Sequence, residues 1–319
     1  MLQDSGGAGL PIAHQERLEI VFLADIPAAH IESAWATTVA RTAVLQAAPA
    51  FPVDAPAIPS WRVDYWESER RFIWTFHHAL LDGRSITAIV GRFLKNLLEN
   101  EIPPFASITC WTPATAEMQA VAEHYFASFP PHLGVSRPPP SAGPRASMAI
   151  AVDLESLAHR LDVSVPTLFI WAWAQAITTV AATEFAIIEQ VRCGAPQEGC
   201  IGFSMNTLPL CIPKGGGDHE IQELRRCLRF LREIETISPY DYPLPIQAHT
   251  RAPWASVVMV ETKRASHPGV FSITLHEAPA ATISASAYLT PSIHLVVEGP
   301  ASEELLAQWA DGLRELATR

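Results

Sequence analysis

The sequence predicts a protein of mixed α and β structure that folds as two lobes. Segments with the periodicity of amphipathic helices alternate along the chain with short apolar segments typical of strands. Residues 130–144 are rich in proline and show neither pattern, which is typical of a stiff, extended connection. The 319 residues, of which 49% are hydrophobic, suffice for one large core or two ordinary ones. We therefore expect an N-terminal lobe at residues 1–130, a proline-rich linker at 131–145 and a C-terminal lobe at 146–319.

The first lobe is predicted to contain three strands and two helices. Strands are expected at residues 17–23, 61–66 and 70–76, where short apolar runs are bounded by polar turns. Helices are expected at 27–46 and 86–98. The second of these keeps apolar residues three and four positions apart over its whole length, which indicates one buried face.

The second lobe is predicted to combine helices with a larger set of strands. The expected strands are at 146–152, 185–191, 207–212, 255–260, 270–275, 282–288 and 293–297. Helices are expected at 154–161, 165–182 and 219–235. A last helix has Ser302 as its N-cap and an acidic first turn.

Residues 165–182 are nearly all apolar over a length that could span a bilayer. Polar side chains interrupt the stretch, and no lysine or arginine flanks it closely. We therefore expect the buried core helix of a soluble protein rather than a membrane span. The first nine residues lack the pattern of a secretory signal, so the expected location is the cytoplasm. The expected oligomeric state is a monomer.

Charge and cysteine content argue against several functions. The formal net charge of −11 offers no excess of cations to a phosphate backbone, so a nucleic acid is not an expected partner. The five cysteines are odd in number and include no C-x-x-C pair. Neither a disulfide framework nor a zinc site is therefore expected.

One short motif carries chemistry. His77-His78-Ala79-Leu80-Leu81-Asp82-Gly83 follows an apolar strand and precedes an amphipathic helix. Successive side chains at a strand end point to opposite faces, so we expect one histidine to act and the other to support it. An imidazole can accept a proton from an attacking amine or hydroxyl. Asp82 is expected to end the loop, and Gly83 to supply a backbone conformation closed to other residues and room for substrate.

Two further features are open to more than one interpretation. Arg225, Arg229 and Arg232 form a stripe on the helix predicted at 219–235, which could dock an acidic carrier or form a solvated face paired with the helix's own glutamates. The glycines at 215–217 lack the frame of a phosphate-binding loop, so a flexible loop is expected there.

The histidine motif resembles the active-site signature of condensation domains of nonribosomal peptide synthetases, which belong to the chloramphenicol acetyltransferase-like superfamily. The stretch 202–210, GFSMNTLPL, is similar to a second family segment. Residues 166–173 are similar to the family's buried helix, and 192–196 to its arginine–proline loop. The resemblance implies an α+β, two-lobed chloramphenicol-acetyltransferase-like fold, with mixed sheets, flanking helices and an active-site tunnel between the lobes.

The resemblance also implies roles for the motif residues. His78 would face the tunnel as base or as orienting group for the nucleophile, with His77 beside it in a supporting role. Gly83 would offer its backbone N–H to a thioester carbonyl, where negative charge develops. No metal and no covalent acyl-enzyme are implied.

Four more residues follow from the same likeness. Asp82 would be structural and pair with Arg192, with Arg62 as the second candidate partner. Ser204 and Asn206 could line the tunnel or satisfy backbone groups at the start of a strand.

The implied function is an acyltransferase of the condensation type that forms amides or esters in natural-product biosynthesis. The resemblance implies no tightly bound cofactor and a donor that is a thioester of carrier-protein phosphopantetheine or of coenzyme A. The partners that it implies are a carrier protein and a small nucleophile. The alternatives are a coenzyme-A-dependent small-molecule acyltransferase and an inactive scaffold for a synthetase. Two departures bear on carrier docking: the chain is short for the family, and Cys211 stands where an arginine is common.

Overall fold

The structure of the protein is a computed structural model, in which the chain divides into two compact units. Unit 1 comprises Met1–Cys110, Pro196–Ser204 and Ala265–Ala278, and unit 2 comprises Trp111–Ala195, Met205–Arg264 and Pro279–Arg319. The residues that the structure describes are 15–47, 61–108, 114–127, 143–193, 199–234, 256–261, 267–276, 283–289 and 292–319.

The unit boundaries differ from the lobes expected at 1–130 and 146–319. Two later segments complete unit 1, because each contributes a strand that pairs with an early one. Strand β10 (Val270–His276) pairs with β1 (Gln15–Phe22), and β7 (Cys200–Ile201) pairs with β4 (Ser107–Ile108). Most of the expected linker at 131–145 lies outside the described residues, and strand β5 begins at its last residue, Arg145.

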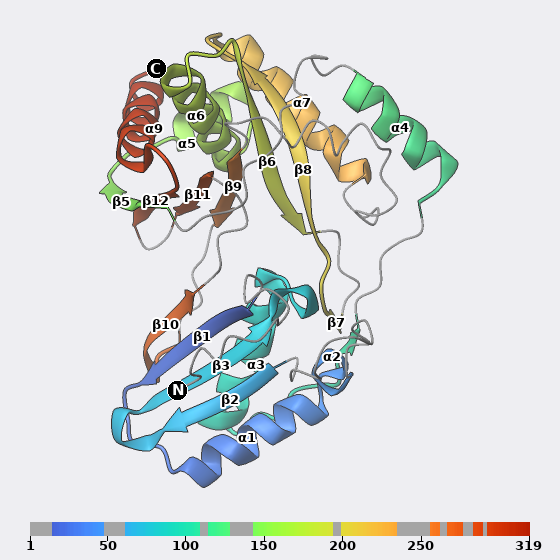
Figure 1. The fold of residues 1–319 in the computed structure, drawn as a ribbon, viewed down its shortest axis with the longest axis vertical. Coiled ribbons are helices and arrows are strands. Elements are labelled where there is room, and N and C mark those ends of the chain that lie inside the picture. The colour runs from blue at the N-terminus through green and yellow to red at the C-terminus, as the bar shows by residue number, and fades with distance from the viewer. Residues whose placement is uncertain are drawn as a thin grey trace, which may run out of the picture. The chain divides into compact units, whose positions relative to one another are not determined.

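Unit 1 is built on a four-stranded sheet in the order β10-β1-β3-β2, with every neighbouring pair antiparallel (Figure 1). Strands β2 (Trp61–Trp66) and β3 (Arg71–His77) are joined by the short 3-10 helix η2 (Glu67–Glu69). The three strands predicted for the first lobe are thus confirmed.

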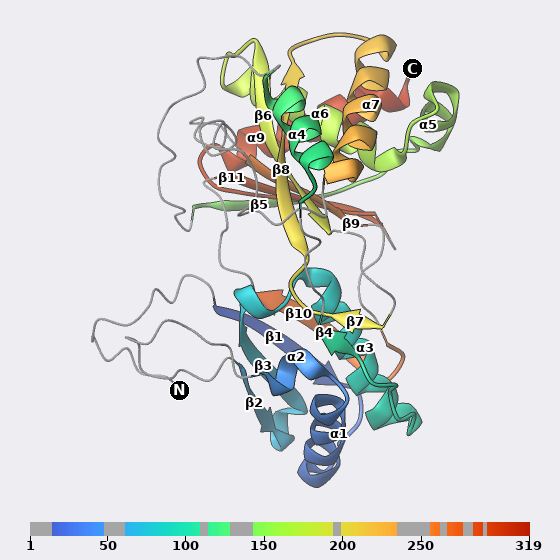
Figure 2. The ribbon, with the colours of Figure 1, turned by 90° about the vertical axis from the view of Figure 1, so that its right-hand side faces the viewer.

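Helices α1 (Ala28–Ala40) and α3 (Gly83–Glu99) cover one face of this sheet (Figure 2). The ring of Trp35 on α1 lies 5.2 Å from that of Trp74 on β3 and 5.4 Å from that of Phe93 on α3, measured between centroids. These aromatic contacts join both helices and the sheet into one core. The helix predicted at residues 86–98 is confirmed as α3.

The single helix expected at residues 27–46 is two helices, because α2 (Ala43–Gln46) is separated from α1. Ala106 interrupts the helix: its N–H donates to the carbonyl of Arg41 at 2.8 Å, and its carbonyl accepts from the N–H of Ala43 at 2.9 Å. Backbone groups that pair with a distant segment cannot complete the i to i+4 ladder.

Unit 2 contains a mixed six-stranded sheet in the order β5-β12-β11-β9-β6-β8. Its strands are β5 (Arg145–Ile150), β6 (Phe185–Cys193), β8 (Met205–Pro213), β9 (Ser256–Glu261), β11 (Ile283–Tyr288) and β12 (Ile293–Glu298). Strand β9 is parallel to both of its neighbours, and the other pairs are antiparallel.

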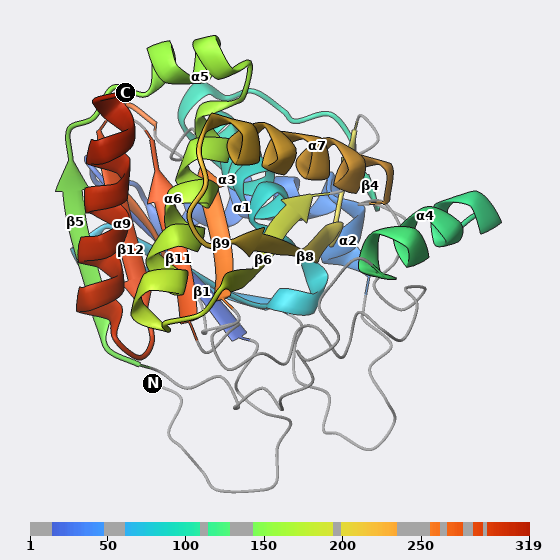
Figure 3. The ribbon, with the colours of Figure 1, turned by 90° about the horizontal axis from the view of Figure 1, so that it is seen from above.

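The helices described in unit 2 are α4 (Ala116–Ala127), α5 (Glu155–Leu161), α6 (Val165–Val180), α7 (Asp218–Ile234) and α9 (Ser302–Ala317). Helices α6, α7 and α9 contact strands of the sheet, whereas α5 packs on α6 and α7, and α4 packs on α7 (Figure 3). The sequence pattern missed α4, but it predicted the other four. The Ser164 hydroxyl accepts from the Thr167 N–H and so caps the first turn of α6.

Helix α6 lies in the core of unit 2, as its composition predicted. Trp173 is fully buried, and its indole N–H donates to the Ser256 hydroxyl on β9 at 2.8 Å. No single helix among the described residues is long and apolar enough to cross a membrane. Helices α5 and α6 pass such a test only as a pair, and they are bent by 96° relative to each other.

The start of α9 differs from the prediction by one residue. Ser302 is the first helical residue, and the N-cap position belongs to Ala301, whose φ of 55° is left-handed and whose side chain cannot cap. Farther along, the Trp309 indole N–H donates to the carbonyl of Phe169 at 3.1 Å, and its ring lies 5.1 Å from that of Trp173. Helices α6 and α9 are therefore joined by a hydrogen bond and a ring contact.

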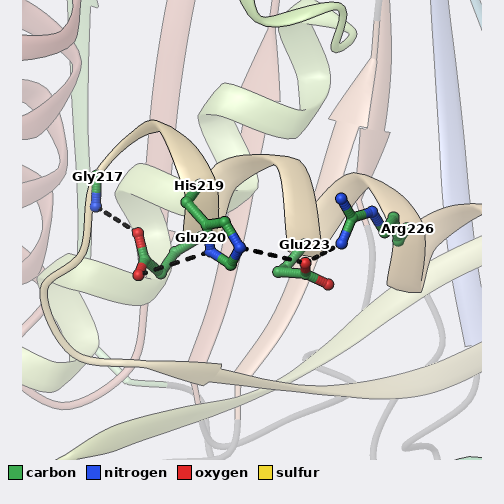
Figure 4. Close-up of polar contacts among 5 residues, drawn as sticks. All are labelled: Gly217, His219, Glu220, Glu223 and Arg226. Carbon is green, nitrogen blue, oxygen red and sulfur yellow. Dashed lines mark hydrogen bonds and ion pairs between the residues drawn. The ribbon is translucent and has the colours of Figure 1, made fainter.

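The first turns of α7 carry a chain of polar contacts (Figure 4). The backbone N–H of Gly217 donates to the Glu220 carboxylate at 2.7 Å, which caps the helix and lowers the pKa of Glu220. His219 lies 3.7 Å from Glu223, which also contacts Arg226. This face of α7 is thus paired within the helix itself.

Arg225 belongs to the stripe of three arginines that the sequence places on this helix. Arg225 pairs with Asp162, at 2.6 Å between Nη1 and Oδ2, rather than with a glutamate of its own helix.

The glycines that precede α7 form the turn into the helix. Gly216 has φ of 98°, and a Cβ there would lie 2.7 Å from the side chain of Glu220, so the turn requires glycine.

Truncation of Trp309 tests the α6–α9 contact. We expect Trp309→Ala to lower the free energy of unfolding by about 3–5 kcal/mol, because it removes a fully buried ring and a hydrogen bond. Urea denaturation measures the change. Gln308→Ala, at an exposed neighbouring position, serves as the control and should change stability by less than about 0.5 kcal/mol. Equal effects of the two changes would contradict this packing.

Candidate functional site

The two histidines stand where β3 ends and a turn leads into α3. Phe72, Trp74 and Phe76 of β3 point into the unit 1 core, and His77 pairs with Gln15 as the last residue of the ladder. The chain then turns through the 3-10 helix η3 (His78–Leu80). His78 therefore leaves the strand alternation, and its side chain is 26% exposed.

A glutamate from the neighbouring strand meets His78. The Nδ1 of His78 lies 2.7 Å from Oε1 of Glu16, at the distance of an ion pair. The ring of Phe203 stands edge-on to the imidazole, with centroids 5.7 Å apart and planes at 87°. Glu16 is not among the site residues predicted from the sequence. Its only signal was a charged residue in phase with Leu18 and Ile20, the inward-facing apolar residues of β1.

Asp82 is fully buried and accepts three hydrogen bonds. Its Oδ1 accepts from the backbone N–H of Ser85 at 2.8 Å, which makes Asp82 the N-cap of α3. Its Oδ2 accepts from both the N–H and the hydroxyl of Ser204, each at 2.8 Å. One carboxylate thus joins the start of α3 to the segment at 202–204.

Ser85 strengthens the same junction. Its hydroxyl donates to the carbonyl of Gly202 at 2.6 Å and accepts from the N–H of Gly202 at 3.0 Å. Hydrogen bonds therefore hold both ends of segment 202–204: Gly202 bonds to Ser85, and Ser204 donates to Asp82. Phe203, between them, is placed against His78.

Gly83 is the first residue of α3, with ordinary helical geometry. The expectation that it needs a backbone conformation closed to other residues is wrong, because its φ is not positive. A Cβ built on Gly83 would meet no atom of the described residues within 4 Å. The backbone N–H groups of a first helical turn have no partner within the helix, so they can receive a developing negative charge.

The structure describes the surroundings of Arg192 and Arg62, but not those of the Asn206 side chain. Arg192 lies on β6 in unit 2, where its Nη1 donates to the side chain of Gln190 at 2.9 Å, and its pairing with Asp82 stays a prediction. Arg62 contacts Asp64 on its own strand at 3.7 Å. Asn206 lies on β8, and its side chain is outside the described residues. A tunnel between the lobes also stays a prediction.

The hydroxyl of Ser204 donates to Asp82, and the lining of a tunnel by Ser204 stays a prediction. Within the described part of the chain, no group of three or more histidine, cysteine and acidic residues could hold a metal ion. Cys211 and Cys227 are free thiols, and burial raises the pKa of Cys211 to about 11.

Comparison with solved structures finds condensation domains. The condensation domain of the monacolin K polyketide synthase MokA matches with a TM-score of 0.70 at 11% identity, over 96% of this chain and 93% of that one. VibH, a condensation enzyme of nonribosomal peptide synthesis, matches with a TM-score of 0.67 at 10% identity, over 96% and 91%. The chain therefore has the fold that is seen in these condensation domains, with mixed α and β structure.

Comparison with curated proteins points in the same direction. A linear gramicidin synthase of Brevibacillus parabrevis is 22% identical over 229 residues, which are 62% of this chain and 3% of that protein. Nonribosomal peptide synthetase aclP of Aspergillus oryzae is 25% identical over 227 residues, 60% of this chain and 14% of that protein. The chain thus spans a small part of the relatives it matches. No family model matches it.

Substitution of Asp82 tests the junction. We expect Asp82→Asn to lower the free energy of unfolding by about 2 kcal/mol, because an amide cannot accept all three hydrogen bonds that the carboxylate accepts. Ser204→Ala removes a single one of these bonds and should cost about 1 kcal/mol. Asp64→Asn, at an exposed ion pair, is the control and should change stability little. Asp82→Asn with unchanged stability would contradict the assignment.

Proposed function

We propose that the chain is an acyltransferase of the condensation type, which moves an acyl group from a thioester to an amine or alcohol. The supporting observation is the position of His78: it follows the last residue of β3, its Nδ1 lies 2.7 Å from Glu16, and it precedes the first turn of α3. This arrangement leaves Nε2 of the imidazole as the nitrogen that can accept a proton from a substrate. The condensation-domain fold adds support.

The proposed reaction uses His78 and the N-terminus of α3. The lone pair of the amine or alcohol attacks the thioester carbonyl carbon, and its proton passes to Nε2 of His78. The carbonyl oxygen becomes an oxyanion that accepts a hydrogen bond from the N–H of Gly83. The tetrahedral intermediate then collapses: its C–S bond breaks, the amide or ester forms, and the thiol leaves with the proton from His78.

The proposed donor is a thioester of phosphopantetheine on a carrier protein. Several curated relatives are peptide synthetases, and the solved neighbours include condensation domains of such synthetases. A thioester of coenzyme A is the alternative donor, because it presents the same pantetheine thiol. The proposed partners are a carrier protein and a small nucleophile.

Incubation with a loaded carrier protein tests the proposal. Mass spectrometry should detect a product that carries the acyl group as an amide or ester, together with free carrier thiol. Release of thiol from acyl-coenzyme A alone would instead favour the coenzyme-A-dependent enzyme. A stable complex with the carrier protein but no product from either donor would contradict the proposed activity and favour a scaffold.

Removal of the His78 imidazole should abolish transfer. We expect His78→Ala to lower turnover by at least about 100-fold with an unchanged circular dichroism spectrum, because the proposed base is lost from a side chain that is partly exposed. His77→Ala, the matched control in the same motif, should retain more activity. Near-normal turnover of His78→Ala would overturn the mechanism.

Removal of one N–H tests the role of Gly83. Proline is tolerated at the first position of a helix, and Asp82 has the extended conformation, φ −93° and ψ 168°, that a following proline requires. We expect Gly83→Pro to lower kcat by about 100-fold or more while α3 stays intact. Gly83→Ala keeps the N–H, and its Cβ meets no described atom, so it is the matched control. Equal activity of the two variants would refute an oxyanion role.

A further inference from the structure

Glu16 lies on the face of β1 that otherwise carries buried apolar side chains. It is in phase with Leu18, Ile20 and Phe22, which are buried in the unit 1 core. In the antiparallel register it pairs with Phe76, another core residue. Residues directly opposite in such a ladder share a face, so the Glu16 side chain starts from the inner face of the sheet.

The burial of Glu16 has an energetic cost that its surroundings offset only in part. The residue is 4% exposed. Among the described residues, its Oε2 is buried with no hydrogen-bond partner. Removing a carboxylate from water costs several kcal/mol unless its partners compensate. A leucine here would avoid that cost, so the stability of unit 1 does not explain this glutamate.

The partner that Glu16 does have is the candidate catalytic histidine. Oε1 of Glu16 lies 2.7 Å from Nδ1 of His78, and Nδ1 is itself a buried atom. The exposed quarter of the His78 side chain therefore belongs to other atoms of the residue. Phe203 contacts the same ring edge-on. The imidazole is thus restrained by a carboxylate at one nitrogen and by an aromatic side chain.

We propose that Glu16 is the positioning residue of His78, an inference that rests on the proposed acyl transfer. Its carboxylate takes the Nδ1–H, which fixes the tautomer with the lone pair on Nε2 and keeps the ring in one orientation. When Nε2 takes the proton of the nucleophile, the imidazole becomes a cation, and the Glu16 carboxylate already lies beside its Nδ1. Such a pair costs stability in the resting protein and favours the charged state that forms during the reaction.

Two variants of Glu16 separate a positioning role from a structural one. Glu16→Gln retains an oxygen that can accept from Nδ1–H but removes the charge, and we expect kcat to fall about 10-fold with little change in KM. Glu16→Leu restores the apolar pattern of β1, and we expect kcat to fall about 100-fold with an unchanged or higher melting temperature. The control is Glu19→Gln, the same change on the outward face of β1, which should retain wild-type turnover.

Nitrogen-15 NMR of histidine-labelled protein gives a readout that is independent of activity. The His78 signals are assigned by their loss in His78→Ala among the 12 histidines. In the neutral ring of the wild type we expect a protonated Nδ1 and an unprotonated Nε2; in Glu16→Leu we expect the opposite form, which free imidazole side chains favour.

The combined outcomes distinguish the two proposals. Wild-type kcat and an unchanged tautomer in Glu16→Leu would overturn the positioning role. A wild-type protein that transfers no acyl group, but whose tautomer switches in Glu16→Leu, would overturn the proposed function and still support the contact. If Glu16→Leu fails to fold, Glu16→Gln decides: full turnover, like that of Glu19→Gln, would overturn the role.

Discussion

The buried carboxylate of Asp82 is the interaction on which the candidate site depends. It caps α3 through Ser85 and anchors segment 202–204 through two bonds to Ser204. Because the group is fully buried, these charge-assisted bonds act in a medium of low dielectric constant, where they are stronger and more costly to lose. Asp82, together with the Ser85 hydroxyl that bonds to Gly202, therefore positions both the helix N-terminus and the Phe203 ring that contacts His78.

Local periodicity predicted most secondary structure, because burial of one face imposes a pattern that the sequence must carry. The helix α3 and the strands of the unit 1 sheet are examples. Long-range pairing leaves no such pattern. The break between α1 and α2 is caused by Ala106, and the composition of unit 1 depends on the pairing of β10 with β1. Ala106 and β10 both lie far along the chain from the segments with which they pair, so local patterns do not reveal these pairings.

For the candidate site, too, the sequence predicted the local motif but not its long-range partners. The motif located His78 and Asp82, and its resemblance to condensation domains agrees with the fold. The partners of these residues come from segments distant in sequence: Ser204 for Asp82 and Glu16 for His78. Alternation along β1 places Glu16 on the buried face, which marks it as unusual, but only the fold shows that the turn after β3 brings His78 to it.

The decisive measurement is a crystal structure with a stable amide analogue of an acyl-pantetheine thioester. We expect the acyl carbonyl oxygen to lie within hydrogen-bond distance of the Gly83 N–H. We also expect Nε2 of His78 to face the carbonyl carbon while Nδ1 stays on Glu16. An analogue bound away from η3 and the start of α3, or an imidazole with Nε2 turned toward Glu16, would contradict this mechanism.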